Sequence, residues 1–298
     1  MDRMIRCISS DGSVMAAAVD STDTVCTAQN IHKTSAVASA ALGRLLTASS
    51  LMGAMLKKEG ASVTLKVKGG GPLGLLVAIS DSRGNCRGFV EHPETELPLK
   101  PDGKLDVGRA VGSSGLLCVI RDFGEGEPYT GQVRLVSGEI GEDVTAYFAE
   151  SEQIPTACAL GVLVDKRDHL VMLSGGLLIQ VLPGASEDAV SRLEKNVAAL
   201  EPVTTMLAKG LSIEDMCRRA LDGSDMEILD EFRVGYACPC SKERVERALA
   251  TLKPEEIRGL ADPKTGKMEA KCHYCGRAYE FTEQELKALA NSLQQGRK

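Results

Sequence analysis

Hydrophobic and polar residues follow two different repeats along the first part of the chain, and together they predict a mixed core of helices and strands. Short runs that alternate apolar with polar side chains predict strands. The stretch over residues 33–58 instead carries its leucines and methionines on one helical stripe, which predicts a long helix. Its many small residues favour close packing of this helix on a sheet. The strands are expected over 14–19, 24–27, 63–68, 75–80, 86–91, 116–122 and 131–137 and within 156–165 and 169–183, with a second helix over 139–150.

The pattern after Pro183-Gly184 predicts three short helices in a row. Ser186 is followed by two acidic residues, which is typical of an N-cap and the first turn of a helix. Ser212 and Asp215 have the spacing of a capping box. Isolated helices of this length are marginal in water. We therefore expect this segment to depend for its stability on the surface against which it packs.

The last part of the chain predicts a small domain. Helices are expected over 241–252 and 254–260, strands over 268–271 and 277–281, and a final helix after a capping box that begins at Thr282. About sixty residues provide little hydrophobic core. Another source of stability is therefore expected here.

Two close pairs of cysteines supply that source. They lie in Cys238-Pro239-Cys240 and in Cys272-His273-Tyr274-Cys275. Four thiolates suit Zn²⁺, which prefers a tetrahedron of soft ligands, and pairs with this spacing are typical of a zinc site. His273 adjoins Cys272 and is expected to point away from a site that already has four sulfurs. The predicted ligands of one zinc ion are Cys238, Cys240, Cys272 and Cys275.

The four cysteines alone leave several functions open. They are compatible with an ordinary set of unliganded thiols, with a zinc that only stabilises a small interaction domain, and with a zinc ribbon that binds nucleic acid. A fourth alternative is a thiol–disulfide oxidoreductase that uses Cys272 and Cys275, although that motif usually opens a helix. A salt-dependent shift of labelled RNA or DNA, or turnover of a model disulfide, would distinguish these alternatives.

Composition and charge narrow the choice. The chain of 298 residues has a net charge of −6, and aromatic residues make up 3% of it, which argues against nucleic-acid binding. Its start lacks the apolar run of a secretory signal, and the apolar stretch over 35–56 contains Arg44 and many polar residues. We expect a cytoplasmic protein without a membrane span. The six remaining cysteines are interpreted as small buried hydrophobic residues: Cys7, Cys26, Cys86, Cys118, Cys158 and Cys217.

No combination of residues predicts an enzyme. Gly69, Gly71 and Gly74 match a dinucleotide-binding motif in spacing, but a strand rather than a helix is expected to follow them. The histidines at 32, 92 and 169 lie far in sequence from any nucleophile with an acid. We expect no catalytic residues.

Together with blocks upstream, the two cysteine pairs resemble the 33 kDa heat-shock chaperonin family, the redox-regulated holdase chaperones of bacteria. The resemblance spans nearly the whole chain. The upstream blocks are Lys68-Gly69-Gly70-Gly71-Pro72-Leu73, Arg87-Gly88-Phe89-Val90, Glu127-Pro128-Tyr129, Gly138-Glu139-Ile140, Tyr147 to Pro155 (YFAESEQIP) and Gly175-Gly176-Leu177-Leu178.

The resemblance implies an α+β fold with three parts: a core domain of mixed sheet and helix over 1–184, a helical linker over 185–232 and a zinc-binding redox-switch domain over 233–298. In the reduced state, it implies one bound Zn²⁺ and no chaperone activity. Oxidation is then expected to form the disulfides Cys238–Cys240 and Cys272–Cys275, to release zinc and to unfold the linker. The expected partners are unfolding client proteins, bound without ATP, and a second copy of the chain on activation; neither nucleic acid nor membrane is expected.

Overall fold

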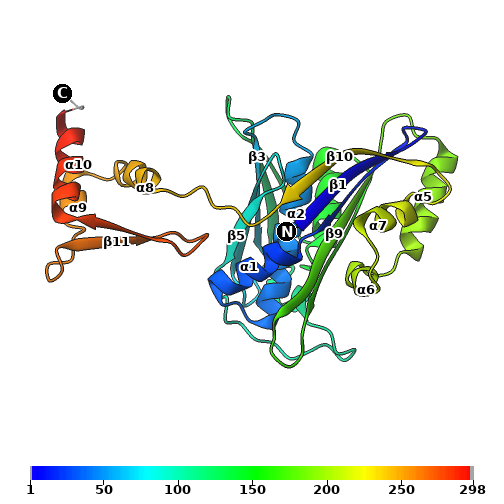
Figure 1. The fold of residues 1–298 in the computed structure, drawn as a ribbon, viewed down its shortest axis with the longest axis horizontal. Coiled ribbons are helices and arrows are strands. Elements are labelled where there is room, and N and C mark those ends of the chain that lie inside the picture. Colours follow the sequence, from blue (N-terminus) through cyan, green and yellow to red (C-terminus); the bar gives the residue numbers. More distant parts are fainter. Residues whose placement is uncertain (1, 296–298) are drawn as a thin grey trace. The chain divides into compact units, whose positions relative to one another are not determined.

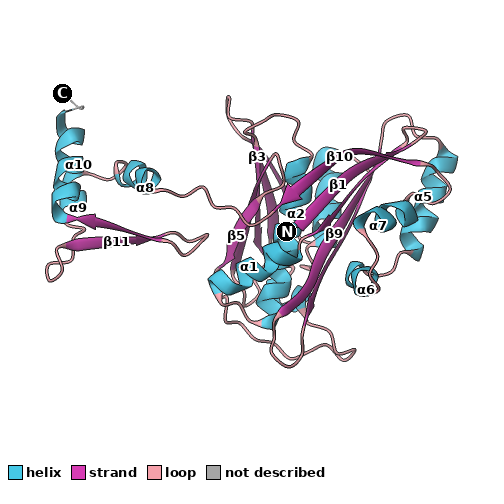
Figure 2. Ribbon diagram, in the orientation of Figure 1, coloured by secondary structure: helices cyan, strands magenta, loops and turns pink. Residues whose placement is uncertain are grey.

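The computed structural model describes residues 2–295, and the chain divides into two compact units, Met1–Ala237 and Cys238–Lys298. Helices and antiparallel sheets both occur in the first unit, so the predicted α+β class is confirmed (Figures 1 and 2). One sheet has the order β10-β1-β2-β9-β8, and the other has the order β5-β4-β3-β6-β7. We call them the first and the second sheet. The strands are β1 Asp2–Ser9, β2 Val14–Asp20, β3 Ser62–Lys68, β4 Leu75–Asp81, β5 Cys86–Val90, β6 Leu116–Asp122, β7 Tyr129–Arg134, β8 Thr156–Val164, β9 Val171–Val181 and β10 Met226–Val234.

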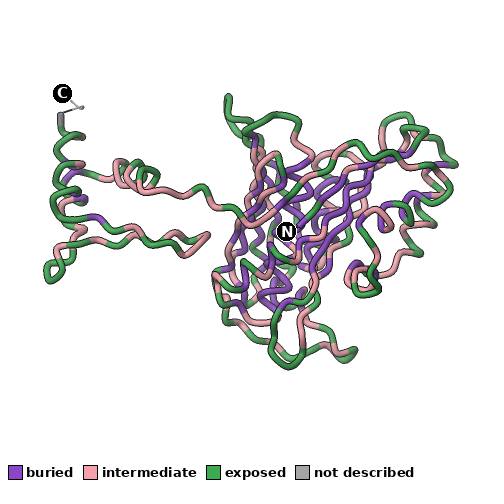
Figure 3. Tube along the Cα trace, in the orientation of Figure 1, coloured by how far each residue is buried: buried purple, intermediate pink, exposed green. Residues whose placement is uncertain are grey.

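Helix α2 (Ala36–Ala54) forms the centre of the first unit. It contacts strands of both sheets and is buried on all sides, apart from Ala36 and Arg44 (Figures 1 and 3). A helix that is apolar all round belongs in an interior. Among the described residues, it is also the one helix long and apolar enough to cross a membrane, but 89% of its apolar window is buried within the protein. Its composition therefore reflects a position between two sheets.

Both faces of the first sheet are covered. On neighbouring positions of β1, Met4 joins the cluster around α2, whereas Ile5 joins a second cluster on the opposite face. Neighbouring residues of β2 and β9 divide between the two clusters in the same way, because successive side chains of a strand point to opposite faces. The second cluster is covered by three helices, α5 Glu187–Ala199, α6 Val203–Ala208 and α7 Ile213–Ala220 (Figure 1).

The expected strand at 24–27 is wrong, because these residues belong to helix α1 (Thr22–His32). The carboxylate of Asp2 accepts hydrogen bonds from the backbone N–H groups of Asp23, at 2.9 Å, and Thr24, at 2.7 Å. These bonds satisfy N–H groups of the first helical turn that have no partner within the helix. The helix expected over 33–58 accordingly begins later, after Lys33 ends α1 in the left-handed conformation.

The expected helix at 139–150 is shorter than predicted. Helix α3 covers Val107–Val111, and α4 covers Gly141–Tyr147 before it widens into a π-helical turn over Phe148–Glu152. The carboxylate of buried Asp143 accepts a backbone hydrogen bond from Val136 at 2.7 Å and one from Ile140 at 2.9 Å. These bonds hold the approach to α4 as a tight loop, so β7 ends before residue 137.

Strand β10 begins within the interval expected as a helical linker and ends two residues beyond it, and the sequence interpretation did not predict it. It pairs with β1 at the edge of the first sheet. Arg3 bonds to Glu231 at 2.8 Å, and Arg6 forms an ion pair with Asp230. Opposite charges on adjacent strands favour this pairing. Of the expected linker over 185–232, three helices are therefore present, and its last residues form a strand.

The structure explains why residues 69 and 71 are glycines. A Cβ atom at Gly69 would overlap the carbonyl oxygen of Gly112, and one at Gly71 would overlap that of Ala110. The backbone N–H of Gly71 donates to Val111 O at 2.9 Å across this crossing. Two backbone segments thus pass at van der Waals distance, which requires residues without side chains.

The second unit is small and has few buried side chains (Figure 3). Its elements are α8 Lys242–Leu249, α9 Pro254–Arg258, β11 Lys267–Lys271, β12 Ala278–Thr282 and α10 Glu283–Gln295. The strands β11 and β12 form an antiparallel hairpin, as predicted. Thr282 and Glu285 form the predicted capping box, with Glu285 accepting the Thr282 N–H at 2.7 Å. Fully buried apolar side chains come from Ile257, Phe281, Leu286 and Ala290.

Candidate functional site

Four cysteines of the second unit converge. The sulfur atoms of Cys238, Cys240, Cys272 and Cys275 all lie within 4.8 Å of one another. The closest pairs bridge the two motifs, with 3.7 Å between Cys238 and Cys272 and 3.2 Å between Cys240 and Cys275. A disulfide requires about 2.05 Å between its sulfurs, so all four are reduced thiols in this geometry.

Local structure places each pair. Cys272 and Cys275 occupy the turn between β11 and β12, where Cys272 N–H donates to Arg277 O at 2.9 Å and Gly276 N–H donates to Cys272 O at 2.9 Å. Gly276 has a φ of 69°, a conformation that glycine adopts without strain. Cys240 directly precedes Ser241, the N-cap of α8. A hairpin turn and a helix start therefore bring the two pairs together.

The donor set fits a tetrahedral metal ion. Four sulfur ligands at about 2.3 Å from a zinc ion lie about 3.8 Å from one another. The distance of 3.7 Å between Cys238 and Cys272 agrees with this value, Cys240 and Cys275 at 3.2 Å need a small separation, and all four sulfurs lie within 4.8 Å of one another. His273 is exposed and is not part of the group that converges. The four cysteines can hold a soft divalent cation.

The four thiols shift one another's pKa because they lie so close together. Burial acts to raise the pKa of Cys240, but hydrogen bonds from Tyr279 and from the other three cysteines outweigh burial and lower this pKa to about 7. Burial is the main cause that raises the pKa of Cys238 to about 12. The protein alone thus favours one thiolate near neutral pH, whereas a divalent cation at the centre would stabilise four.

The sequence interpretation missed Tyr279. Its hydroxyl donates a hydrogen bond to Cys240 Sγ at 3.1 Å. The pattern of β12 contained a usable signal, because Tyr279 alternates with the apolar Phe281 and so lies on the inner face of the hairpin. The contact was not predicted because Tyr279 is far from Cys240 in sequence.

The chain segment that leads to Cys238 is anchored within the first unit. After β10, Gly235 O accepts a hydrogen bond from Cys86 N–H at 3.0 Å, and Ala237 N–H donates to Cys86 O at 2.9 Å. The hydroxyl of Tyr236 donates to Gly88 O at 2.9 Å. Residues 235–237 therefore continue β10 as a connection to β5 of the second sheet.

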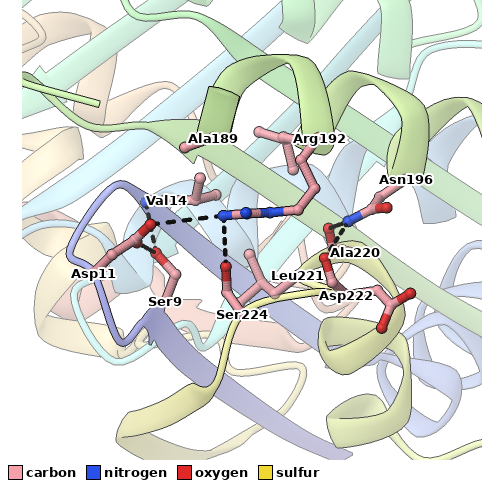
Figure 4. Close-up of a pocket in the computed structure, with 11 residues that line it drawn as sticks. Ser9, Asp11, Val14, Ala189, Arg192, Asn196, Ala220, Leu221, Asp222 and Ser224 are labelled. Carbon is pink, nitrogen blue, oxygen red and sulfur yellow. Dashed lines mark hydrogen bonds and ion pairs between the residues drawn. The ribbon is translucent and has the colours of Figure 1, made fainter. Parts of the chain in front are cut away.

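Polar contacts hold α5 and α7 at one end of the first sheet (Figure 4). Arg192 of α5 donates to Ser224 Oγ at 2.8 Å and lies 3.7 Å from the carboxylate of Asp11. Asn196 donates to the carbonyl oxygens of Ala220, at 3.1 Å, and Asp222, at 2.9 Å. The pocket among these residues is small, with room for about one water molecule. These contacts attach the helices to one another and to the β1–β2 turn.

The other six cysteines differ in exposure. Cys7, Cys86 and Cys217 are buried, as predicted, whereas Cys26, Cys118 and Cys158 are only partly buried. Cys7 lies on β1 and Cys217 on α7, and the two thiols interact across the boundary between sheet and helix. This pair therefore marks the boundary between the first sheet and its covering helices.

Comparison with known proteins gives one consistent result. A family model described as Hsp33 protein matches residues 2–282. A protein named 33 kDa chaperonin from Geobacillus kaustophilus is 44% identical over 288 residues, which cover 97% of this chain and 97% of that protein. Its namesake from Agathobacter rectalis is 46% identical over 289 residues, 97% of this chain and 99% of that protein. The crystal structure of the 33 kDa chaperonin from Thermotoga maritima matches with a TM-score of 0.88 and 34% identity, covering 98% of this chain and 99% of that chain.

Proposed function

The chain belongs to the Hsp33 family, and we propose that it is a redox-regulated holdase that binds unfolding client proteins without ATP. The observation that carries the proposal is the convergence of four cysteine sulfurs within 4.8 Å, in a unit with little core of its own. The proposal includes a cytoplasmic location, no catalytic turnover, and no binding to nucleic acid or membrane. It also includes a homodimer on activation.

We assign Cys238, Cys240, Cys272 and Cys275 as ligands of one zinc ion in the reduced protein. When bound, the ion would hold four thiolates together and so stabilise the second unit. Arg277 and Lys242 add positive charge to the second unit. The Lys242 ammonium lies 4.8 Å from the centroid of the Phe281 ring and 2.6 Å from the Glu285 carboxylate. In this state the chaperone is inactive.

Oxidation by a peroxide would pair the sequence neighbours, Cys238 with Cys240 and Cys272 with Cys275. A thiolate attacks one oxygen of the peroxide to give a sulfenic acid and release hydroxide. The neighbouring thiolate then attacks the sulfenic sulfur, which forms the disulfide and releases a second hydroxide. A disulfide sulfur is a far poorer ligand than a thiolate, so the four cysteines no longer hold the ion.

The loss of these ligands would also affect the linker helices, because the linker and the second unit are connected along the chain. The second unit begins at Cys238, directly after the anchored residues 235–237 and strand β10. The linker helices α5 to α7 precede β10 and are short. When the second unit unfolds, β10 would lose the folded unit that follows it in the chain, and we propose that the short helices before β10 are released with it.

Release of α5 to α7 would expose one whole face of the first sheet. The covered side chains on this face are apolar, and they come from β1, β2 and β9: Ile5, Cys7, Ala16, Ala18, Leu177 and Ile179. Exposed apolar surface of this kind binds other apolar chains. We propose this face, together with the apolar sides of the released helices, as the surface that holds clients.

Cysteine labelling tests the opening step. In the reduced, metal-loaded protein we expect Cys7 and Cys217, both 0% exposed, to resist N-ethylmaleimide. After oxidation with peroxide and removal of the oxidant, both should react, because α7 has left the sheet. Partly buried Cys118 is the internal reference for reagent activity. Peptide mass mapping gives the rate at each site.

Cys86 serves as the matched control for this experiment. It is buried within the cluster around α2, and burial raises the pKa of its thiol to about 12. It should stay protected after oxidation. Continued protection of Cys217 in fully oxidised protein would contradict linker release, and equal labelling of Cys86 and Cys217 would show that the whole first unit has unfolded.

A further inference from the structure

Tyr279 is held against the thiol cluster by the fold of the hairpin. It lies on β12 opposite Ala270 of β11, and its ring packs with the core of the second unit. Buried Phe281 lies two residues further on the same face of the strand. The position of the ring is therefore fixed by backbone pairing and by packing, and its hydroxyl reaches Cys240 Sγ at 3.1 Å.

A second side chain acts on the same hydroxyl. The positive charge of Arg277 acts on the Tyr279 hydroxyl and also on Cys240 and Cys275. A positive charge that acts on a hydroxyl polarises the O–H bond and makes it a stronger donor. The three residues thus form a chain of contacts that ends at one sulfur of the four.

A hydrogen bond to a thiolate opposes its oxidation. The attacking thiolate gives an electron pair to the peroxide oxygen, and its negative charge leaves with the released hydroxide. A charge-assisted hydrogen bond stabilises the thiolate before attack and weakens as that charge is lost. The barrier to reaction is therefore higher for the sulfur that accepts the bond.

We propose that Tyr279 is a positioning residue that protects Cys240 from oxidation, so that peroxide reacts first at another of the four sulfurs. The residue would thereby set the dose of peroxide at which the centre opens. This inference rests on the proposed function, since it concerns the regulation of the same centre. It assigns a role to a side chain that is not itself a metal ligand.

The test compares the wild-type protein with Tyr279→Phe, which keeps the ring and removes only the hydroxyl. Both zinc-loaded proteins receive less than one equivalent of hydrogen peroxide in the presence of dimedone, which traps sulfenic acids. Mass mapping then gives the share of adduct at each cysteine. We expect the share at Cys240 to rise about threefold to tenfold in the variant, the effect of losing one hydrogen bond to a charged sulfur. An unchanged share at Cys240 would overturn the inference.

Two further variants keep the test decisive. Lys242→Met removes a nearby positive charge whose contacts are Glu285 and the Phe281 ring, and it should leave the share at Cys240 at the wild-type value. Arg277→Gln leaves the tyrosine in place, and we expect a smaller rise in the same direction. If Tyr279→Phe binds less than one equivalent of zinc, Arg277→Gln decides, and no rise in that variant would overturn the inference.

The failure of this inference differs from the failure of the proposed function. A wild-type protein that binds no zinc, or that gives no chaperone activity after oxidation, would contradict the proposed function whatever Tyr279 does. Zinc binding and activation that persist with an unaltered adduct pattern in Tyr279→Phe would contradict the role of Tyr279 alone.

Discussion

Removal of the metal by a strong chelator should unfold the second unit and leave the strands around α2 folded. The buried cluster of the second unit is small, and its members among the residues that the structure describes are Ile257, Phe281, Leu286 and Ala290. Structural zinc contributes on the order of 10 kcal/mol in small domains. An ordinary domain is stable by about 5–15 kcal/mol. Loss of the zinc would therefore remove most or all of the stability of the second unit.

Hydrogen exchange followed by mass spectrometry measures this effect for each element. Amides of β11, β12 and α8 should lose protection in the chelator, whereas those of β3, β4 and β9 should keep it. Cys272→Ser should behave like the chelated protein, because it removes one ligand. Cys118→Ser is the matched control, since Cys118 lies on β6 outside the cluster. Undiminished protection of β12 and α10 in chelated protein would contradict a unit that depends on metal.

Met216→Asp should produce a chaperone that is active without oxidation. Met216 of α7 is 0% exposed and lies in the cluster between the helices and the first sheet, near Ile5 and Ala220. A carboxylate without a partner in such a place destabilises by about 3–5 kcal/mol. Helices of this length have no reserve of stability of that size. The linker should therefore leave the sheet while the four cysteines remain reduced.

The matched control lies on the opposite side of the same helix. Arg218 is exposed, and it pairs with Asp215 at 3.0 Å on the surface, an interaction worth little. Arg218→Gln should leave the reduced protein inactive. The measurement is light scattering from a thermally unfolding test protein under reducing conditions, with zinc content determined in the same samples. Labelling of Cys217 in Met216→Asp without any protection of the client would show that linker release alone does not create the binding surface.

The structural features that the sequence predicted best are those that depend on residues close together in the chain. The hairpin around Cys272 and Cys275 follows from two short alternating runs and a glycine, and the capping box at Thr282 follows from four consecutive residues. The convergence of the two cysteine pairs was predictable because their spacing is typical of ligands of one ion. The hairpin and the capping box are each decided within a short distance along the chain.

Contacts between distant parts of the chain decided the features that the sequence did not reveal. The start of α1 depends on the carboxylate of Asp2, about twenty residues earlier. Strand β10 looks too polar for a sheet until Arg3 and Arg6 of β1 lie opposite its acids. The contact between Tyr279 and Cys240 spans 39 residues. In each case a charge or a hydroxyl finds its partner only after the chain has folded.

The central claim is that the same four cysteines hold the metal and control the chaperone. It is tested most directly by the aggregation of a thermally unfolding client in the presence of the protein, reduced and zinc-loaded or oxidised by peroxide. Zinc release is followed in the same samples with a colorimetric chelator. We expect protection of the client only after oxidation, rising in step with the zinc released. Complete zinc release without protection would contradict the claim, and would leave the zinc with a structural role alone.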